Sequence, residues 1–201
     1  DYVRFPTEGR IEEAVFSFDP EVLSKSAVIT DFVRRMRAAL EPTGARLSAD
    51  IFGVTAWGSR ADIETIGQNV DDLLEYLDAV SPMLYPSHFA DGFGRISSPV
   101  AHPYYFLYQG CQRLRARAAE RGVEVRPWVQ AFDYRVPKYD ATYITEQLYG
   151  AEDGGARGWL LWNPASRYPF EIRAIAEFMA GTSPLLSQEQ RRPKPVGSPA
   201  D

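Results

Sequence analysis

Short stretches with the character of β-strands alternate with longer stretches of helical periodicity along the first 180 residues of the chain. Strands are expected where apolar side chains recur at every second position or form a short run, and helices where they recur every three or four positions. The expected strands are 1–5, 46–52, 79–85, 123–132 and 158–163. The expected helices are 26–40, 70–77, 104–121, 143–151 and 170–179. Five strand–helix units in strict alternation predict parallel strands joined by right-handed crossovers.

Two of the expected strands carry polar residues on one face. Ser48 and Asp50 share a face of the second strand, and Arg126 and Gln130 share a face of the fourth. A parallel sheet with helices on both sides is apolar on both faces, whereas the lumen of a barrel accepts polar side chains near its C-terminal rim. No G-x-G-x-x-G or P-loop turn follows a strand, as a nucleotide-binding open sheet would require. The pattern therefore favours an α/β protein of the (β/α)8 TIM-barrel type.

The length of the chain predicts only part of such a barrel. A complete barrel takes about 250 residues, so five units within residues 1–180 are expected to supply strands four to eight. The N-terminal remainder of the barrel is expected to be missing from this chain. Residues 181–201 are rich in Pro, Ser and Arg and lack periodicity, which predicts a disordered tail.

Charge and cysteine content exclude several classes of partner. The net charge is −5, from 22 basic and 27 acidic residues, and no basic block precedes the tail, which argues against nucleic acid. The single cysteine, Cys111, excludes an internal disulfide and a multi-cysteine metal site. His88 and His102 lack metal-ligand spacing, so neither a metal nor another cofactor is expected. No apolar run reaches the roughly 18 residues of a membrane span.

The residues at the strand ends suggest glycosidic chemistry. A parallel barrel places its site at the C-terminal ends of its strands. The candidates there are Asp1, Arg4, Asp50, Tyr85, His88, Trp128, Gln130, Asp133, Trp162 and Asn163. Asp1 and Asp50 are the expected acids, because hydrolysis of a glycosidic bond needs one carboxyl to protonate the leaving oxygen and a second to act as nucleophile or base. The other eight residues are expected to bind the substrate.

The separation of the two acids follows from strand spacing. If Asp1 and Asp50 lie on neighbouring strands, which are about 4.8 Å apart, their carboxyls can approach the roughly 5–5.5 Å typical of retaining enzymes. Structural alternatives remain open at this stage. Asp1 can instead pair with Arg4, Asp50 can accept backbone N–H groups, and His88 can be an ordinary loop residue. The two tryptophans at the strand ends can simply pack at the rim.

Five strand motifs occur in a fixed order along nearly the whole chain up to about residue 180. They are Asp1-Tyr-Val-Arg-Phe-Pro6, Ser48-Ala-Asp-Ile-Phe-Gly53, Ser81-Pro-Met-Leu-Tyr-Pro-Ser-His88, Arg126-Pro-Trp-Val-Gln130 and Gly158-Trp-Leu-Leu-Trp-Asn163. Together they resemble a bacterial family of glycoside hydrolases in the TIM-barrel glycosidase group, long catalogued as a domain of unknown function. The resemblance implies a (β/α)8 barrel from its fourth strand onward, with Asp1 as the nucleophile or central carboxylate. It also implies a carbohydrate substrate and an extracellular or cell-envelope location.

Two functions follow as expectations. The first is a glycoside hydrolase that cleaves a polysaccharide by a two-carboxylate mechanism. The alternative is a non-catalytic carbohydrate-binding barrel, a degenerate glycosidase whose acids only hydrogen-bond sugar hydroxyls. The two differ in whether two carboxyls face one cleft about 5–10 Å apart.

Overall fold

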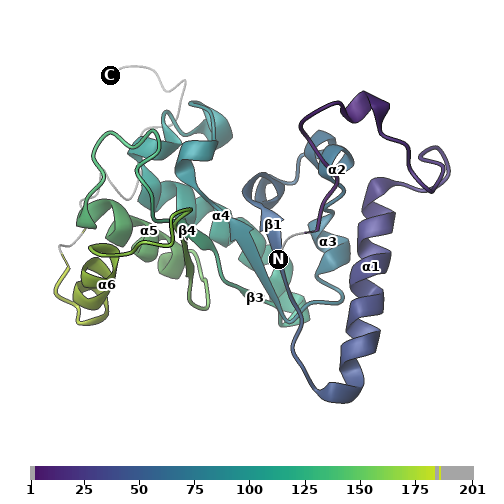
Figure 1. Ribbon diagram of the computed structural model, residues 1–201. Helices are drawn as coiled ribbons and strands as arrows, with labels where there is room; N and C mark the ends of the chain where they lie inside the picture. Colours follow the sequence, from purple (N-terminus) through teal and green to yellow (C-terminus); the bar gives the residue numbers. More distant parts are fainter. Residues whose placement is uncertain (1–2, 184–185, 187–201) are drawn as a thin grey trace.

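A parallel β-sheet lies at the centre of the chain, with helices packed against one of its faces (Figure 1). The computed structural model describes residues 3–183 and 186, so Asp1 and most of the tail expected over 181–201 lie outside the described residues. The strands are β1 (Ser48–Phe52), β2 (Ala79–Met83), β3 (Glu124–Val125), β4 (Trp128–Gln130) and β5 (Leu160–Trp162). The α-helices are α1 (Lys25–Leu40), α2 (Arg60–Ile66), α3 (Val70–Leu73), α4 (Pro103–Ala118), α5 (Ala141–Asp153) and α6 (Glu171–Met179).

The strand order is β1-β2-β4-β5, and every pairing is parallel. β3 pairs with the first half of β2, and β4 continues beside the end of β2. The stretch 123–132, expected as one strand, is thus divided at Pro127, because proline has no N–H to donate to the neighbouring strand. The parallel α/β alternation expected from the sequence is confirmed from β1 onward.

The expected first strand, 1–5, is not formed over its described residues, Val3–Phe5. The N–H of Phe5 donates to the carbonyl of Ile66 at 3.0 Å. The carbonyl of Val3 accepts from Gln68 Nε2 at 3.0 Å, while Gln68 Oε1 accepts from the N–H of Phe52 at 2.8 Å. A side-chain amide therefore stands between Val3 and β1 where a strand ladder was expected. Because β3 and β4 both lie beside β2 and occupy one position, the described sheet has four strand positions, where the sequence predicted five.

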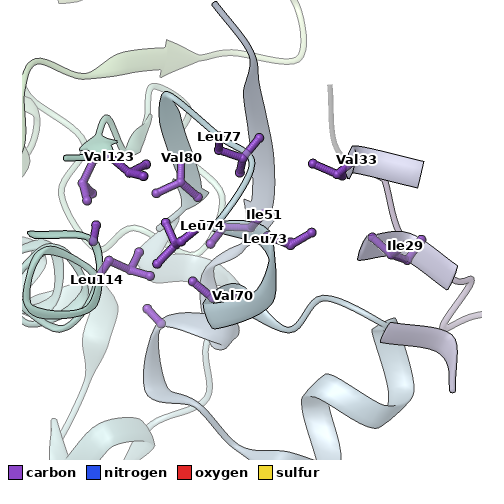
Figure 2. Packing of buried hydrophobic residues seen from close by; sticks show 13 residues of the cluster. Ile29, Val33, Ile51, Val70, Leu73, Leu74, Leu77, Val80, Leu114 and Val123 are labelled. Carbon is purple, nitrogen blue, oxygen red and sulfur yellow. The ribbon is translucent and has the colours of Figure 1, made fainter. Parts of the chain in front are cut away.

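The face of the sheet that meets the helices is a continuous apolar core. Ile51 of β1 and Val80 of β2 are fully buried against α1, α3 and α4 (Figure 2). Further along the sheet, Val129 of β4 packs against α5 and α6. Alternate residues of a strand point to opposite faces, so these apolar positions leave the residues between them for the other face.

Close packing of α5 against α4 sets the position of α5 relative to the end of β4. A Cβ at Gly150 would come within 2.2 Å of the carbonyl oxygen of Tyr104, so only glycine permits this approach. At the start of α5, the Asp140 side chain accepts from the N–H of Tyr143 at 3.1 Å and caps the helix. Both features place Tyr143 and Gln147 of α5 beside β4.

Arginine–carboxylate pairs hold the N-terminal end of the sheet. Asp78, just before β2, accepts from the N–H of Leu47 at 2.6 Å and from Arg37 Nη2 at 2.7 Å. The Leu47 N–H, aided by Arg37, holds the pKa of Asp78 below its ordinary value. Glu124 at the start of β3 pairs with Arg46 at 3.2 Å and also with Arg126.

Within the described part of the chain, every helix is too short or too polar to cross a membrane.

Candidate functional site

The face of the sheet away from the helices carries polar and aromatic side chains. In register across the sheet, Asp50 of β1 lies beside Ser81 of β2, Phe52 beside Met83, and Met83 beside Trp128 of β4. Asp50, Phe52, Met83 and Trp128 are all partly exposed, unlike the buried residues that alternate with them. Asp50 therefore lies on the face away from the helices, where the sequence predicted the polar residues of this strand.

The segment after β2 forms a rim at the C-terminal end of the sheet. Tyr85 is buried, and the short 3₁₀ helix Pro86–His88 follows it. Ser87 is fully buried, whereas His88 reaches the surface. Partial burial of the ring, together with the nearby Arg135 charge, lowers the pKa of His88 below 6.5. The imidazole is therefore mostly neutral near pH 7.

Four aromatic rings meet at this rim. The ring centre of Tyr85 lies 5.4 Å from that of His88 and 5.7 Å from that of Phe132. His88 in turn lies 5.8 Å from Phe132 and 6.1 Å from Tyr134. We call Tyr85, His88, Phe132 and Tyr134 the aromatic rim. The sequence interpretation missed Phe132 and Tyr134, although both lie in the loop after β4.

A cavity of about 460 Å³ opens beside the aromatic rim, at the ends of β1 and β2. It is lined by Phe52, Gly53, Val54, Met83, Tyr85, His88, Phe89, Ala90 and Phe93. These residues are mostly apolar and include no carboxylate. Gly53 is required here because a Cβ would lie 2.3 Å from the carbonyl oxygen of Met83.

Gln130, expected to bind substrate, is fully buried and bonded within the protein. Its Oε1 accepts from the N–H of Ser87 at 3.1 Å and from the hydroxyl of Tyr143 at 3.4 Å. Its Nε2 donates to the carbonyls of Phe132 at 2.9 Å and Tyr134 at 3.3 Å. The amide therefore connects the two loops of the aromatic rim instead of facing a ligand.

The residues at the end of β5 also have structural contacts. The Asn163 side chain donates to the carbonyl of Ala131 and accepts from the N–H of Ala165 at 2.8 Å, which fixes the turn after β5. Trp162 remains 44% exposed, and its ring centre lies 6.1 Å from that of Trp128 in an edge-to-face contact. Asp133 is exposed in the loop after β4.

The acid sites are only partly described. Asp50 lies half-buried on the inner face, two positions before Phe52, and Asp1 lies outside the described residues. The Arg4 guanidinium lies 4.8 Å from the ring centre of Phe52 and donates to the carbonyl of Phe5 at 2.9 Å. Arg4 thus approaches the cavity wall. The expected 5–5.5 Å between Asp1 and Asp50 assumed direct strand pairing, which Val3–Phe5 lack.

The structure thus brings some predicted residues together and not others. Tyr85 and His88 share one rim with Phe132 and Tyr134, and Trp128 meets Trp162. Gln130 and Asn163 serve the protein's own loops. Across residues 3–183 and 186, His, Cys, Asp and Glu side chains form no group of three or more that could hold a metal ion.

The parallel α/β fold, with aromatic and polar residues at the C-terminal ends of its strands, is consistent with a TIM-barrel-like domain. A family model described as "Putative glycosyl hydrolase domain" matches residues 1–168, and the chain belongs to this family. The resemblance of the five strand motifs is thereby confirmed.

The solved structures include a similar fold. The glycoside hydrolase domain of PgaB (BpsB) from Bordetella bronchiseptica matches with a TM-score of 0.54 and 17% sequence identity. The match covers 77% of this chain and 41% of that chain, so this chain spans less than half of the length of that structure. At this identity the likeness supports the fold alone. None of the curated proteins matches the chain.

Proposed function

We propose that the chain supplies strands four to eight of a (β/α)8 barrel and acts as a glycoside hydrolase on a polysaccharide. Membership of a glycosyl hydrolase family supports the reaction class. The parallel order β1-β2-β4-β5, with its inner face partly exposed, supports the barrel. A barrel of this kind presents its site at the C-terminal ends of the strands, where the aromatic rim lies.

The observation that carries this proposal is the aromatic rim beside its cavity. Sugar rings have apolar faces that pack on aromatic side chains, while their hydroxyls need hydrogen-bonding groups at the edges. Tyr85 and His88 provide rings with polar atoms, and Tyr134 is 59% exposed beside them. A saccharide unit in the cavity would contact Phe52 and Met83 as well.

The chemistry assigned to this site uses two carboxyl groups. One carboxylic acid gives its proton to the glycosidic oxygen as the bond to the anomeric carbon breaks. The second carboxylate attacks that carbon or removes a proton from the water that does, and the hydroxyl of the water ends on the anomeric carbon. We assign these roles to Asp1 and Asp50. Asp50 qualifies by position, because it lies on the inner face and not among the helices.

A second function, carbohydrate binding without hydrolysis, is favoured by one specific observation. The lining of the cavity beside Tyr85 and His88 contains no carboxylate. A saccharide held there would contact rings and main chain, and Asp50 would only hydrogen-bond a hydroxyl. The two functions make different predictions for the same variants.

The test is a polysaccharide panel applied to the full-length protein and to its Asp1→Asn and Asp50→Asn variants. Released reducing ends report hydrolysis, and retention on immobilised polysaccharide reports binding. Asp62→Asn, which changes a carboxylate on α2, is the matched control. We expect the wild type and the control to release reducing ends. Asp1→Asn and Asp50→Asn should each lose at least about 100-fold in kcat, as removal of a general acid or base does.

Each alternative result has a defined meaning. Activity that survives both substitutions removes the assignment of Asp1 and Asp50. Binding without released reducing ends in the wild type establishes the carbohydrate-binding function instead. A protein that neither binds nor cleaves any member of the panel contradicts the proposed function altogether.

A further inference from the structure

We propose that Gln130 is a positioning residue that fixes the loop after β2 against the loop after β4 and so assembles the aromatic rim. The identity of the ligand that binds this rim, a saccharide, rests on the proposed function. The positioning role of Gln130 rests on the geometry alone. Gln130 itself has no access to a ligand, because its side chain is fully buried. It acts through the rings of His88, Phe132 and Tyr134.

The hydrogen bonds of Gln130 account for its whole amide. A glutamine side chain has two N–H donors and an oxygen with two lone pairs. Both donors go to the loop after β4, at the carbonyls of Phe132 and Tyr134. One lone pair accepts from the N–H of Ser87 in the loop after β2, and the other from the hydroxyl of Tyr143 on α5. A single neutral group thus joins two loops and a helix.

A second buried glutamine holds Gln130 in place. Gln147 of α5 accepts from the N–H of Gln130 at 2.9 Å and donates to its carbonyl at 3.0 Å. The same Nε2 lies 3.1 Å from the carbonyl of Tyr143. The main chain of Gln130 is therefore held from α5, which leaves its side chain aimed at the rim.

Ser87 forms two hydrogen bonds that join the loop after β2 to β4 and the loop after it. Its N–H donates to Gln130, and its carbonyl accepts from Arg135 Nη1 at 2.8 Å. Arg135 has a φ of 60°, a left-handed backbone that L-residues rarely adopt, so the loop after β4 bends to bring the guanidinium there. Ser87 precedes His88, and its Oγ lies 3.3 Å from His88 Nδ1. The placement of the imidazole therefore follows from the placement of Ser87.

Gln130→Met tests the role without adding charge. Methionine has a similar length and is unbranched, but it offers no amide, so the N–H of Ser87 and the carbonyls of Phe132 and Tyr134 lose their partner. Gln68→Met is the matched control. Gln68 is also buried and also bonds three main-chain groups, but these belong to Val3, Asp50 and Phe52, away from Ser87.

The readout is the NMR titration of His88, with His102 as the second histidine of the chain. Within the described part of the chain, the groups seen to face His88 include the charged Arg135 and the titratable Tyr85 and Tyr134. A rim that opens exposes the imidazole to water, so Gln130→Met should raise the pKa of His88 toward its ordinary value. It should also weaken the nuclear Overhauser contacts from His88 to Phe132 and Tyr134. Gln68→Met should lower stability and leave both readouts at wild-type values.

Two results would overturn the role. One is an unchanged His88 pKa with unchanged ring contacts in Gln130→Met. The other is an equal change in Gln68→Met, which would mean that any loss of stability moves the rim. If Gln130→Met does not fold, hydrogen exchange of the wild type decides instead. The Ser87 N–H should exchange as slowly as the buried N–H groups of β4, and exchange at the rate of an exposed loop contradicts the proposal.

Enzyme kinetics distinguish the positioning role of Gln130 from the proposed glycoside hydrolase function. With the polysaccharide that the panel identifies, Gln130→Met should raise KM about tenfold with little change in kcat, as expected when binding contacts are lost uniformly. A wild type that cleaves no polysaccharide contradicts the proposed function, while the His88 readouts still decide the positioning role.

Discussion

The two ends of the sheet are held together by different chemistry. At the N-terminal end, Asp78 and Glu124 pair with arginines from neighbouring segments. At the C-terminal end, the buried amides of Gln68, Gln130 and Gln147 join the main chain of β1, of β4 and of the rim loops. One end is linked by charges near the surface, the other by neutral groups in the interior.

The neutral amides stabilise the C-terminal end of the sheet without adding charge to the candidate ligand site. Amides connect loops without a net charge and without titration near neutral pH, so they leave the electrostatics of the rim to the residues that meet a ligand. Buried amides are also demanding, because any lost partner leaves a polar group unsatisfied. Surface ion pairs are more forgiving, since water replaces a missing partner. Three substitutions test this contrast.

The largest effect on stability is expected from Gln68→Leu. The change leaves the N–H of Phe52 and the carbonyl of Val3, both partly buried, without their partner from the buried Gln68. Each such group costs about 1–3 kcal/mol, so the free energy of unfolding should fall by about 2–4 kcal/mol, measured by urea denaturation.

The matched control for this change is Gln112→Leu. Gln112 is exposed on α4 and donates to the hydroxyl of Tyr108 at 2.7 Å. Its replacement should change the free energy of unfolding by less than about 0.5 kcal/mol. Equal losses in the two variants would contradict the role of buried amides at the C-terminal end.

A smaller and pH-dependent effect is expected from Asp78→Asn at the other end. Because the pKa of Asp78 is lower in the folded chain than its ordinary 3.8, its ionised form stabilises the fold. That contribution is complete above pH 5 and is lost as the pH falls through the folded pKa. The variant should be less stable than wild type by at most about 1 kcal/mol at pH 7.

The difference between wild type and Asp78→Asn should narrow as the pH falls below about 5 and close once the pH is below the folded pKa of Asp78, in urea denaturation at stepped pH. Asp91→Asn, an exposed carboxyl in a loop, serves as the control and should follow the wild type at every pH. If the difference in the free energy of unfolding instead widens toward low pH, the pKa of Asp78 is not lowered in the folded chain.

The smallest effect on stability is expected from Tyr134→Ala, with a larger effect on binding. Tyr134 is 59% exposed, so the free energy of unfolding should change by less than about 0.5 kcal/mol. Loss of one ring contact, about 0.5–1.5 kcal/mol, should weaken saccharide binding roughly two- to tenfold in a retention assay. Phe32→Ala, which removes a ring that is 47% exposed on α1, should leave binding unchanged. Equal weakening by both variants would place the saccharide elsewhere.

Local patterns in the sequence predicted most of the architecture from β1 onward. The period of apolar positions located β1, β2, β4 and β5 and the longer helices, because strand and helix geometry depend on near neighbours. The same alternation placed Ile51 on the helix side and Asp50 on the inner face. Strand ends at Tyr85 and His88 were found because a parallel sheet collects them at one edge.

The sequence did not reveal which residues meet at that edge. Gln130 and Ser87 are 43 positions apart, and Gln68 and Val3 are 65 apart, so no periodicity relates them. A glutamine at a strand end resembles a substrate-binding residue until its four partners are known. Phe132 and Tyr134 join the rim through ring contacts with Tyr85 and His88, which are distant from them in the sequence.

By itself, the sequence determined a parallel α/β chain of glycosidase type with its candidate site at the strand ends, because those features follow from local periodicity and motif order. Only the tertiary structure decided that Val3–Phe5 meet β1 through a glutamine, that Gln130 serves the loops, and that four rings form the rim. The physical reason is that hydrogen-bond satisfaction in the interior is settled by groups far apart in the chain, which compete for the same partners once the helices have packed.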